Sequence, residues 1–199
     1  MKKEEQALLI LSARALSYPT EQWKIKMKEM NEVIEEIFPK RKGQRITNMY
    51  VPLLRTEIRE LQRIYVETFD LKSNLGLYLT AYELGDSNRR GAALIKLQKI
   101  INVHGFERDE SELADYIPML LEFLAVAPKN EETKRLWKRM SVAVSYMTEK
   151  IDRENPYAQI LEILKTYVFP VPSKEEIRLL ELGREKADLE ELPYPIMYQ

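Results

Sequence analysis

The stretch EETKRLWKRMSVAVSYMTEKID, residues 131–152, decides the fold class of this chain. Its large apolar side chains recur every three or four residues, at Trp137, Met140, Val144, Met147 and Ile151. This spacing gathers them on one face of a helix, because an α-helix completes a turn in about 3.6 residues. The stretch therefore predicts an amphipathic helix with one face in a core.

Helical periodicity continues on both sides of this stretch, and recognisable helix ends divide it into segments. Thr20 is a candidate N-cap, Gly105 is a stop signal, and Ser173 with Glu176 forms a capping-box pattern. No alternating strand pattern of useful length interrupts the series. The predicted helices lie at about 3–17, 21–38, 52–69, 75–84, 87–104, 116–127, 131–152, 156–167 and 174–186.

These segments predict an all-α, single-domain helical bundle of eight or nine helices, which covers residues 1–186. Residues 187–199 form a predicted flexible tail. The apolar end of this tail either stays mobile or docks in a groove of its own or a neighbouring chain.

Three local features, one between the predicted helices and two within them, carry expectations of their own. The basic segment 40–45 is expected to be a loop. Pro52 is expected near the start of a helix, where proline is preferred. Gly91 weakens its helix relative to alanine, so close packing of a neighbouring helix is expected there.

Composition excludes several classes of function. Lys and Arg number 31 against 32 Asp and Glu, and this balance argues against a nucleic-acid binder and a polybasic membrane anchor. The chain has no cysteine and a single histidine, so thiolate and multi-histidine metal sites are excluded. His104 is expected to end a helix, where its charge suits the helix dipole. We expect no enzyme activity, no bound metal and no cofactor.

The N-terminus loosely resembles a secretory signal, because Lys2 and Lys3 precede a short apolar run. However, acidic residues stand before the run, and Arg14 interrupts the apolar residues after it. We therefore expect an amphipathic helix in place of a cleaved signal, no membrane-spanning segment and a cytoplasmic protein.

The segment ELADYIPMLLEF, residues 112–123, is the main candidate for recognition. If Asp115 is the N-cap of a helix, Pro118 falls in its first turn, where a missing N–H costs little. Tyr116, Leu120 and Phe123 then share one face, with Met119 and Glu122 beside it. Six acids and one base between residues 107 and 122 form either a solvated loop or an anionic rim that attracts a basic peptide.

Two earlier segments add candidate residues. Tyr65 and Phe69 lie four residues apart and stack along a helix, either in the core or, together with Asp70, at the rim of a pocket. Arg89 and Arg90 either face solvent or pair with acidic residues elsewhere.

Four motifs in register resemble the cytoplasmic chaperones of molybdenum redox enzymes, and most closely the nitrate reductase assembly chaperones, also called delta subunits. The motifs are YVETFD at 65–70, LYLT at 77–80, GDSNRRG at 85–91 and ELADYIP at 112–118, continued by LEF at 121–123. In the wider family an Asp-His pair occupies the last motif. Asp115-Tyr116 stands there in this chain, which fits the nitrate reductase branch.

The resemblance implies a private chaperone that binds the N-terminal segment of the catalytic alpha subunit of a respiratory nitrate reductase. It implies assistance with insertion of the molybdenum cofactor and an iron–sulfur cluster before assembly at the membrane. A helical adaptor with an unrelated partner is the alternative. The oligomeric state stays open between a monomer and a weak dimer.

On this basis we hypothesise that a client helix lies against the third, fifth and sixth predicted helices. The apolar wall of this protein's site is formed by Tyr65, Phe69, Tyr116 and Phe123. Lysine or arginine residues of the client meet Glu112, Asp115 and Glu122. The complete predicted peptide site is Tyr65, Phe69, Asp70, Arg89, Arg90, Glu112, Asp115, Tyr116, Met119, Glu122 and Phe123.

Overall fold

The structure is a computed structural model that describes residues 1–71, 74–85, 87–107 and 112–189, with the backbone alone described over 183–189. Within these ranges the chain folds into helices joined by short connections, which confirms the all-α prediction. The elements are α1 (Lys3–Ala15), α2 (Glu21–Ile37), α3 (Lys40–Arg55), α4 (Ile58–Tyr65), the π-helical turn η1 (Val66–Asp70), α5 (Leu79–Leu84), α6 (Arg89–Val103), α7 (Ile117–Val126), α8 (Glu131–Lys150), α9 (Ala158–Tyr167) and α10 (Lys174–Leu189).

The centre of the bundle is built around α7, α1 and α9. Helix α1 packs against both α7 and α9, and α9 also packs against α8. The side chains of Leu120 and Leu121 in α7 and of Leu161 in α9 are completely buried. Helix α7 is apolar almost all round, and residues on several of its sides are therefore buried.

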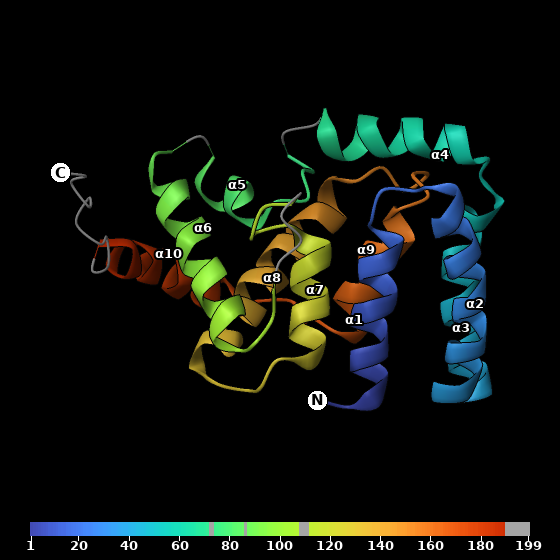
Figure 1. Cartoon of the computed structure of the whole chain (residues 1–199), viewed down its shortest axis with the longest axis horizontal. Coiled ribbons are helices and arrows are strands. Elements are labelled where there is room, and N and C mark those ends of the chain that lie inside the picture. Colours follow the sequence, from blue (N-terminus) through green and yellow to red (C-terminus); the bar gives the residue numbers. More distant parts are fainter. Residues whose placement is uncertain (72–73, 86, 108–111, 190–199) are drawn as a thin grey trace.

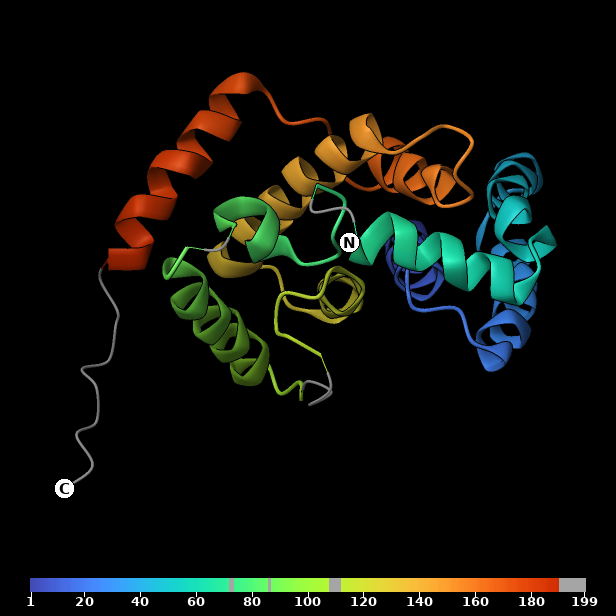
Figure 2. The same ribbon diagram turned by 90° about the horizontal axis from the view of Figure 1, so that it is seen from above.

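The remaining helices extend the molecule to either side of this centre. Figure 1 shows α2 and α3 as an antiparallel pair at one end and α10 at the other. The view from above in Figure 2 places α10 along the outside, beside α6 and α8. None of the described helices is long and apolar enough to cross a membrane.

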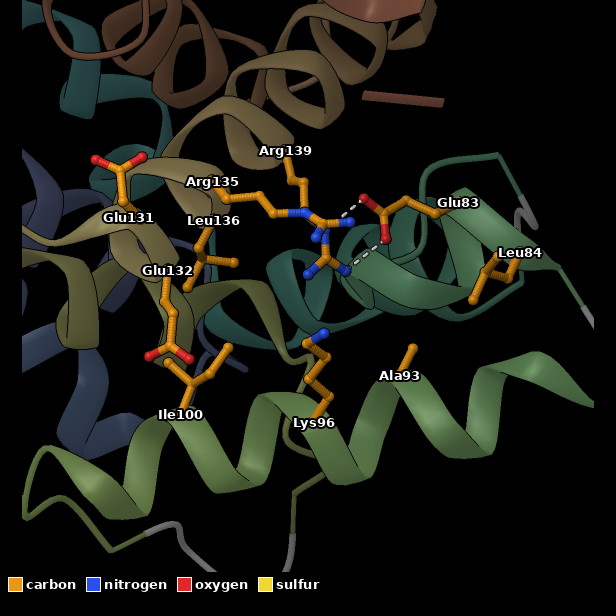
Figure 3. A pocket seen from close by; sticks show the side chains of 10 residues that line it. All are labelled: Glu83, Leu84, Ala93, Lys96, Ile100, Glu131, Glu132, Arg135, Leu136 and Arg139. Carbon is orange, nitrogen blue, oxygen red and sulfur yellow. Dashed lines mark hydrogen bonds and ion pairs between the residues drawn. The ribbon is translucent and has the colours of Figure 1, made fainter. Parts of the chain in front are cut away.

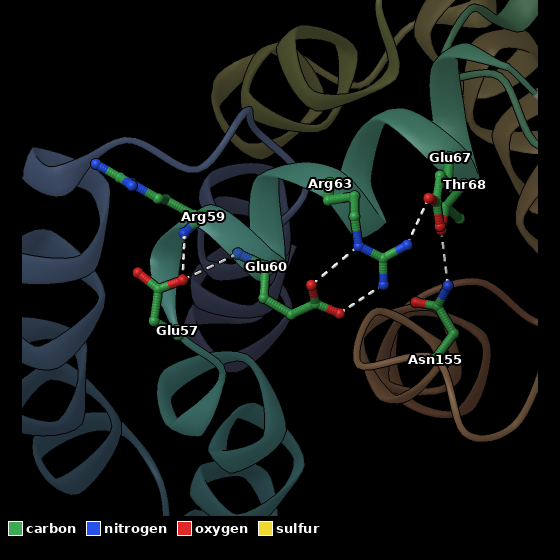
Figure 4. Close-up of polar contacts among 7 residues, drawn as sticks. All are labelled: Glu57, Arg59, Glu60, Arg63, Glu67, Thr68 and Asn155. Carbon is green, nitrogen blue, oxygen red and sulfur yellow. Dashed lines mark hydrogen bonds and ion pairs between the residues drawn. The ribbon is translucent and has the colours of Figure 1, made fainter.

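Helix α4 begins where the sequence supplies a carboxylate cap. Glu57 accepts hydrogen bonds from the backbone N–H groups of Arg59, at 3.0 Å, and Glu60, at 3.1 Å (Figure 4). Beyond α4, Asn155 Nδ2 donates to Thr68 Oγ1 at 2.7 Å and ties η1 to the turn before α9. This contact fixes η1, which carries the candidate Phe69 directly after Tyr65 at the end of α4.

The sequence prediction for 40–55 was wrong. Residues 40–45 form the first turns of α3 and are not a loop, and Pro52 lies near the end of that helix. Ile46, Tyr50 and Leu53 are buried at i, i+4, i+7 spacing, but the preceding run of basic residues obscures this stripe in the sequence. Gly43 faces α2, and an added Cβ would lie 3.4 Å from Ile34 Cγ2, about an ordinary van der Waals distance.

Several helix ends match their predicted signals. Thr20 accepts from Trp23 N at 3.1 Å, and Ser173 and Glu176 form the reciprocal capping box. Helix α6 ends before Gly105, which has a φ of 78°. Helix α10 continues to Leu189, and the rest of the predicted tail, 190–199, lies outside the described residues.

Candidate functional site

The segment before α5 pairs with the segment before α7. Leu79 N donates to Asp115 O at 2.9 Å, and Ile117 N donates to Leu77 O at 2.8 Å. These bonds make Tyr78 and Tyr116 an isolated antiparallel bridge. Two of the sequence motifs, separated by about 35 residues in the chain, therefore meet at one point.

Asp115 is the polar centre of this meeting point. Its side chain is completely buried, and its Oδ2 accepts from Thr80 N at 3.0 Å and from the Thr80 hydroxyl. Arg90 donates from Nε to Thr80 Oγ1 at 3.3 Å, and its Nη2 lies 3.8 Å from Asp115 Oδ2. We call Asp115, Thr80 and Arg90 the Asp115 junction. It joins the beginnings of α5, α6 and α7.

Two predictions for Asp115 were wrong. Asp115 is not the N-cap of α7, because Tyr116 occupies that position and makes no side-chain cap bond. Nor does its carboxylate face solvent, where it would meet a client cation. Pro118 does lie in the first turn of α7, as predicted.

Three of the four rings assigned to the apolar wall are buried in this structure. Tyr65 and Phe69 are 5% and 4% exposed and pack edge-on against each other, with ring centroids 5.0 Å apart. Both rings also contact Tyr157, which is fully buried. Phe123 is 4% exposed and packs edge-on against Phe106. These three rings belong to the core and do not line an open wall.

Tyr116 connects this buried cluster with the surface. Its hydroxyl lies 3.2 Å from that of Tyr65, which in turn donates to Leu16 O at 3.2 Å. Burial raises the pKa of Tyr65, and the nearby Tyr116 adds to this effect. The Tyr116 ring is half-buried and lies 5.6 Å from the ring of Tyr78.

The accessible candidates gather on the outer side of α7. Tyr116 and Met119 are half-buried and Glu122 is exposed, at a spacing of three residues that keeps them on one stripe. Glu112 is half-buried and accepts from the Tyr78 hydroxyl at 3.0 Å. We define the outer face of α7 as Tyr78, Glu112, Tyr116, Met119 and Glu122.

The other predicted residues lie around this face or outside the described ranges. Asp70 and Arg89 are exposed, whereas Arg90 turns inward to the Asp115 junction. Two of the six acids in the predicted anionic rim, Asp109 and Glu110, lie outside the described residues, whereas Glu107 is described and exposed. His104 is the C-cap residue of α6, and its Nε2 lies 3.1 Å from Asn130 Nδ2.

Sequence reasoning did not assign roles to Thr80 and Tyr78. Both belong to the LYLT motif, and this motif was the sequence signal that could have identified them.

Within the described residues, no cluster of three or more His, Cys, Asp or Glu side chains is arranged to hold a metal.

The family model described as "Nitrate reductase delta subunit" matches residues 44–153, more than half of the chain. This chain belongs to the nitrate reductase delta subunit family. The matched range runs from α3 to the end of α8 and includes the Asp115 junction and the outer face of α7. The resemblance drawn from the four motifs is therefore confirmed.

Proteins similar to this chain are known from several bacteria. The probable nitrate reductase molybdenum cofactor assembly chaperone NarJ of Bacillus subtilis is 26% identical over 163 residues, which cover 81% of this chain and 88% of that protein. The corresponding chaperone NarJ of Escherichia coli K12 is 28% identical, with 78% and 67% of the two chains covered. The nitrate reductase-like protein NarX of Mycobacterium tuberculosis H37Rv is 29% identical over 53% of this chain, but over only 18% of its own length.

Proposed function

We propose that this protein is an assembly chaperone for a molybdenum-containing nitrate reductase. It binds the N-terminal segment of the catalytic alpha subunit in the cytoplasm. It holds that subunit competent for insertion of the molybdenum cofactor and an iron–sulfur cluster, and it catalyses no reaction itself. The observation that carries this proposal is the family match over residues 44–153, supported by relatives named as assembly chaperones.

The outer face of α7 is the surface that best suits such a client segment. Its half-buried Tyr116 and Met119 offer apolar contact, and Glu112 and Glu122 supply negative charge. A basic amphipathic helix would lay its apolar side on Met119 and place lysine or arginine beside the carboxylates. Because the segment becomes ordered on binding, part of the contact energy offsets its lost conformational entropy.

Titration calorimetry tests this site with a synthetic peptide that carries the first residues of the alpha subunit. We expect saturable binding to the wild-type protein. Met119→Glu or Glu122→Lys should weaken it by about tenfold, equivalent to ~1.4 kcal/mol. The loss for Glu122→Lys should be larger at low salt, since salt screens exposed charges.

Glu29→Lys is the matched control, because Glu29 is an exposed acid in the middle of α2 and the substitution changes the net charge equally. Equal losses for Glu29→Lys and Glu122→Lys would contradict the assigned face. Absence of heat and of NMR shift changes would reject peptide binding itself. A pull-down from native cytosol distinguishes the chaperone, which retains a molybdoenzyme large subunit, from an adaptor that retains another protein.

A further inference from the structure

A separate cavity of about 250 Å³ lies between α5, α6 and α8, outside the Asp115 junction and the outer face of α7. Ala93, Ile100 and Leu136 supply apolar lining. Charged side chains enter it from all three helices: Glu83 from α5, Lys96 from α6, and Arg139 from α8. The cavity therefore combines an apolar part with a charged part, as small-molecule sites commonly do.

An ion pair closes the charged end of this cavity. Arg139 donates from Nε to Glu83 Oε1 at 2.8 Å and from Nη2 to Oε2 at 2.6 Å. The side chains are only 15% and 3% exposed, so the pair is largely removed from water. The carboxylate occupies one edge of the guanidinium, and Nη1 makes no hydrogen bond within the described part of the chain. Arg139 thus keeps donors for another acceptor.

Lys96 brings a further positive charge to the same place. Figure 3 shows its side chain reaching from α6 toward the guanidinium groups of Arg135 and Arg139. Lys96 is half-buried, and no carboxylate of the described residues lies within 4.0 Å of its Nζ. Among the described residues, Lys96 and Arg139 therefore meet beside the Glu83 carboxylate, and two cations around one carboxylate favour an additional anion.

The other acidic residues of the cavity lie away from these cations. Glu131 and Glu132 come from the first turn of α8 and stand on the opposite side of the pocket in Figure 3. Glu131 is bound to Lys134 at 2.6 Å on the exposed surface of that helix. The positive charge is thus concentrated at the Lys96–Arg139 end.

We propose that this cavity binds a small molecule through a phosphate or diphosphate group. A tetrahedral oxyanion can present separate oxygens to Lys96 and Arg139 and still keep others for water, whereas a carboxylate has only two oxygens to share. The apolar lining then receives the organic part of the ligand. This proposal does not depend on the chaperone proposal, because it concerns different residues and a different ligand.

Calorimetry and NMR with sodium pyrophosphate test the site, with ionic strength held constant by sodium chloride. Saturable binding with shift changes at α6 and α8 amides is expected for the wild-type protein. Lys96→Gln should weaken binding by at least about tenfold. Lys99→Gln, which removes an exposed charge from the same helix, should leave the affinity unchanged. Equal losses in the two variants, or no saturable binding, would overturn the proposal.

Thermal unfolding supplies an independent measurement. Without an added anion, Lys96→Gln should unfold at the same or a higher temperature, since it relieves repulsion between cations. Pyrophosphate should raise the melting temperature of the wild-type protein and leave that of Lys96→Gln nearly unchanged. A lower melting temperature for the ion-free variant, or equal stabilisation by succinate at matched ionic strength, would contradict a phosphate-class site.

Discussion

Asp115 contacts its polar neighbours through a single carboxylate oxygen. Its Oδ2 receives the Thr80 donors and faces Arg90, while Oδ1 is buried with no hydrogen-bond partner among the described residues. A buried carboxylate is costly to desolvate, so its contacts must compensate for the loss of water. At the scale of the residue, Asp115 holds three helix starts together, and Tyr116 next to it is the residue that reaches the surface.

Asp115→Ala should therefore lower the free energy of unfolding by about 2–3 kcal/mol, because it leaves the Thr80 donors and Arg90 without their acceptor. Asp115→Asn should cost less, about 1 kcal/mol, because an amide oxygen still accepts from Thr80. Urea unfolding followed by circular dichroism measures both. Glu122→Ala, at an exposed position of the same motif, is the control and should change stability by less than about 0.5 kcal/mol. A change of that small size for Asp115→Ala would contradict the role of the junction.

Tyr78 makes the protein sensitive to alkaline pH. Burial, and then its hydrogen bond with Glu112, raise the pKa of Tyr78 to about 12. The unfolded value is about 10, so this group's contribution to stability is complete below pH ~10 and is lost as pH rises through about 12. The difference in phenolate absorbance between wild type and Tyr78→Phe should show a transition near the upper value. A transition near the unfolded value would contradict both the burial of the Tyr78 hydroxyl and its contact with Glu112.

At the scale of the element, the two glycines around the connection between α5 and α6 have opposite roles. Gly85 ends α5 with a φ of 56°, a conformation that side chains with a Cβ rarely adopt. Gly91 lies inside α6 and is exposed, and nothing stands within 4 Å of the place where a Cβ would be. The close helix packing that was expected at Gly91 is thus not observed in the described structure, and that prediction was wrong.

A matched pair of alanine substitutions separates these roles. Gly91→Ala should stabilise the protein by about 0.5–1 kcal/mol, because alanine favours the helix and meets open space. Gly85→Ala should destabilise it by about 1 kcal/mol, because of backbone strain alone. Denaturant unfolding compares the two variants with wild type. Destabilisation by Gly91→Ala would indicate that another chain or segment covers that position.

At the scale of the whole molecule, α10 lies on the outside of the bundle, beside α6 and α8. None of its side chains is buried between Lys174 and Leu182, and Leu179 is 55% exposed. By contrast, α9 buries Ile160, Leu161 and Ile163 completely. Hydrophobic burial is roughly proportional to the apolar area removed from water, so α9 contributes much more to stability than the described part of α10.

A variant that ends at Pro172 should therefore keep cooperative unfolding, with a melting temperature only about 2–4 °C below that of the full chain. A variant that ends at Asp152 also lacks α9 and should not fold cooperatively, so it serves as the contrasting control. Differential scanning calorimetry distinguishes these outcomes. Loss of cooperative unfolding in the longer variant would mean that α10 belongs to the core.

The sequence by itself determined the helical class, most helix positions and the family. These properties follow from local spacing: apolar stripes such as that of α8, caps such as Thr20, and four short motifs read in order. Local patterns did not predict the start of α3, where basic residues precede the apolar stripe. The charged surface of a helix and a solvated loop have similar amino-acid compositions, so composition does not distinguish them.

Only the tertiary structure decided which candidate residues are accessible. Tyr65 and Tyr116 look alike in the sequence, but contacts with distant helices bury one and leave the other at the surface. Aspartate is a common helix N-cap residue, yet the hydrogen-bond partner of Asp115, Thr80, lies far away in the chain. The convergence of Lys96 and Arg139 is equally non-local. Burial and charge pairing depend on which elements pack together, and periodicity along one helix does not contain that information.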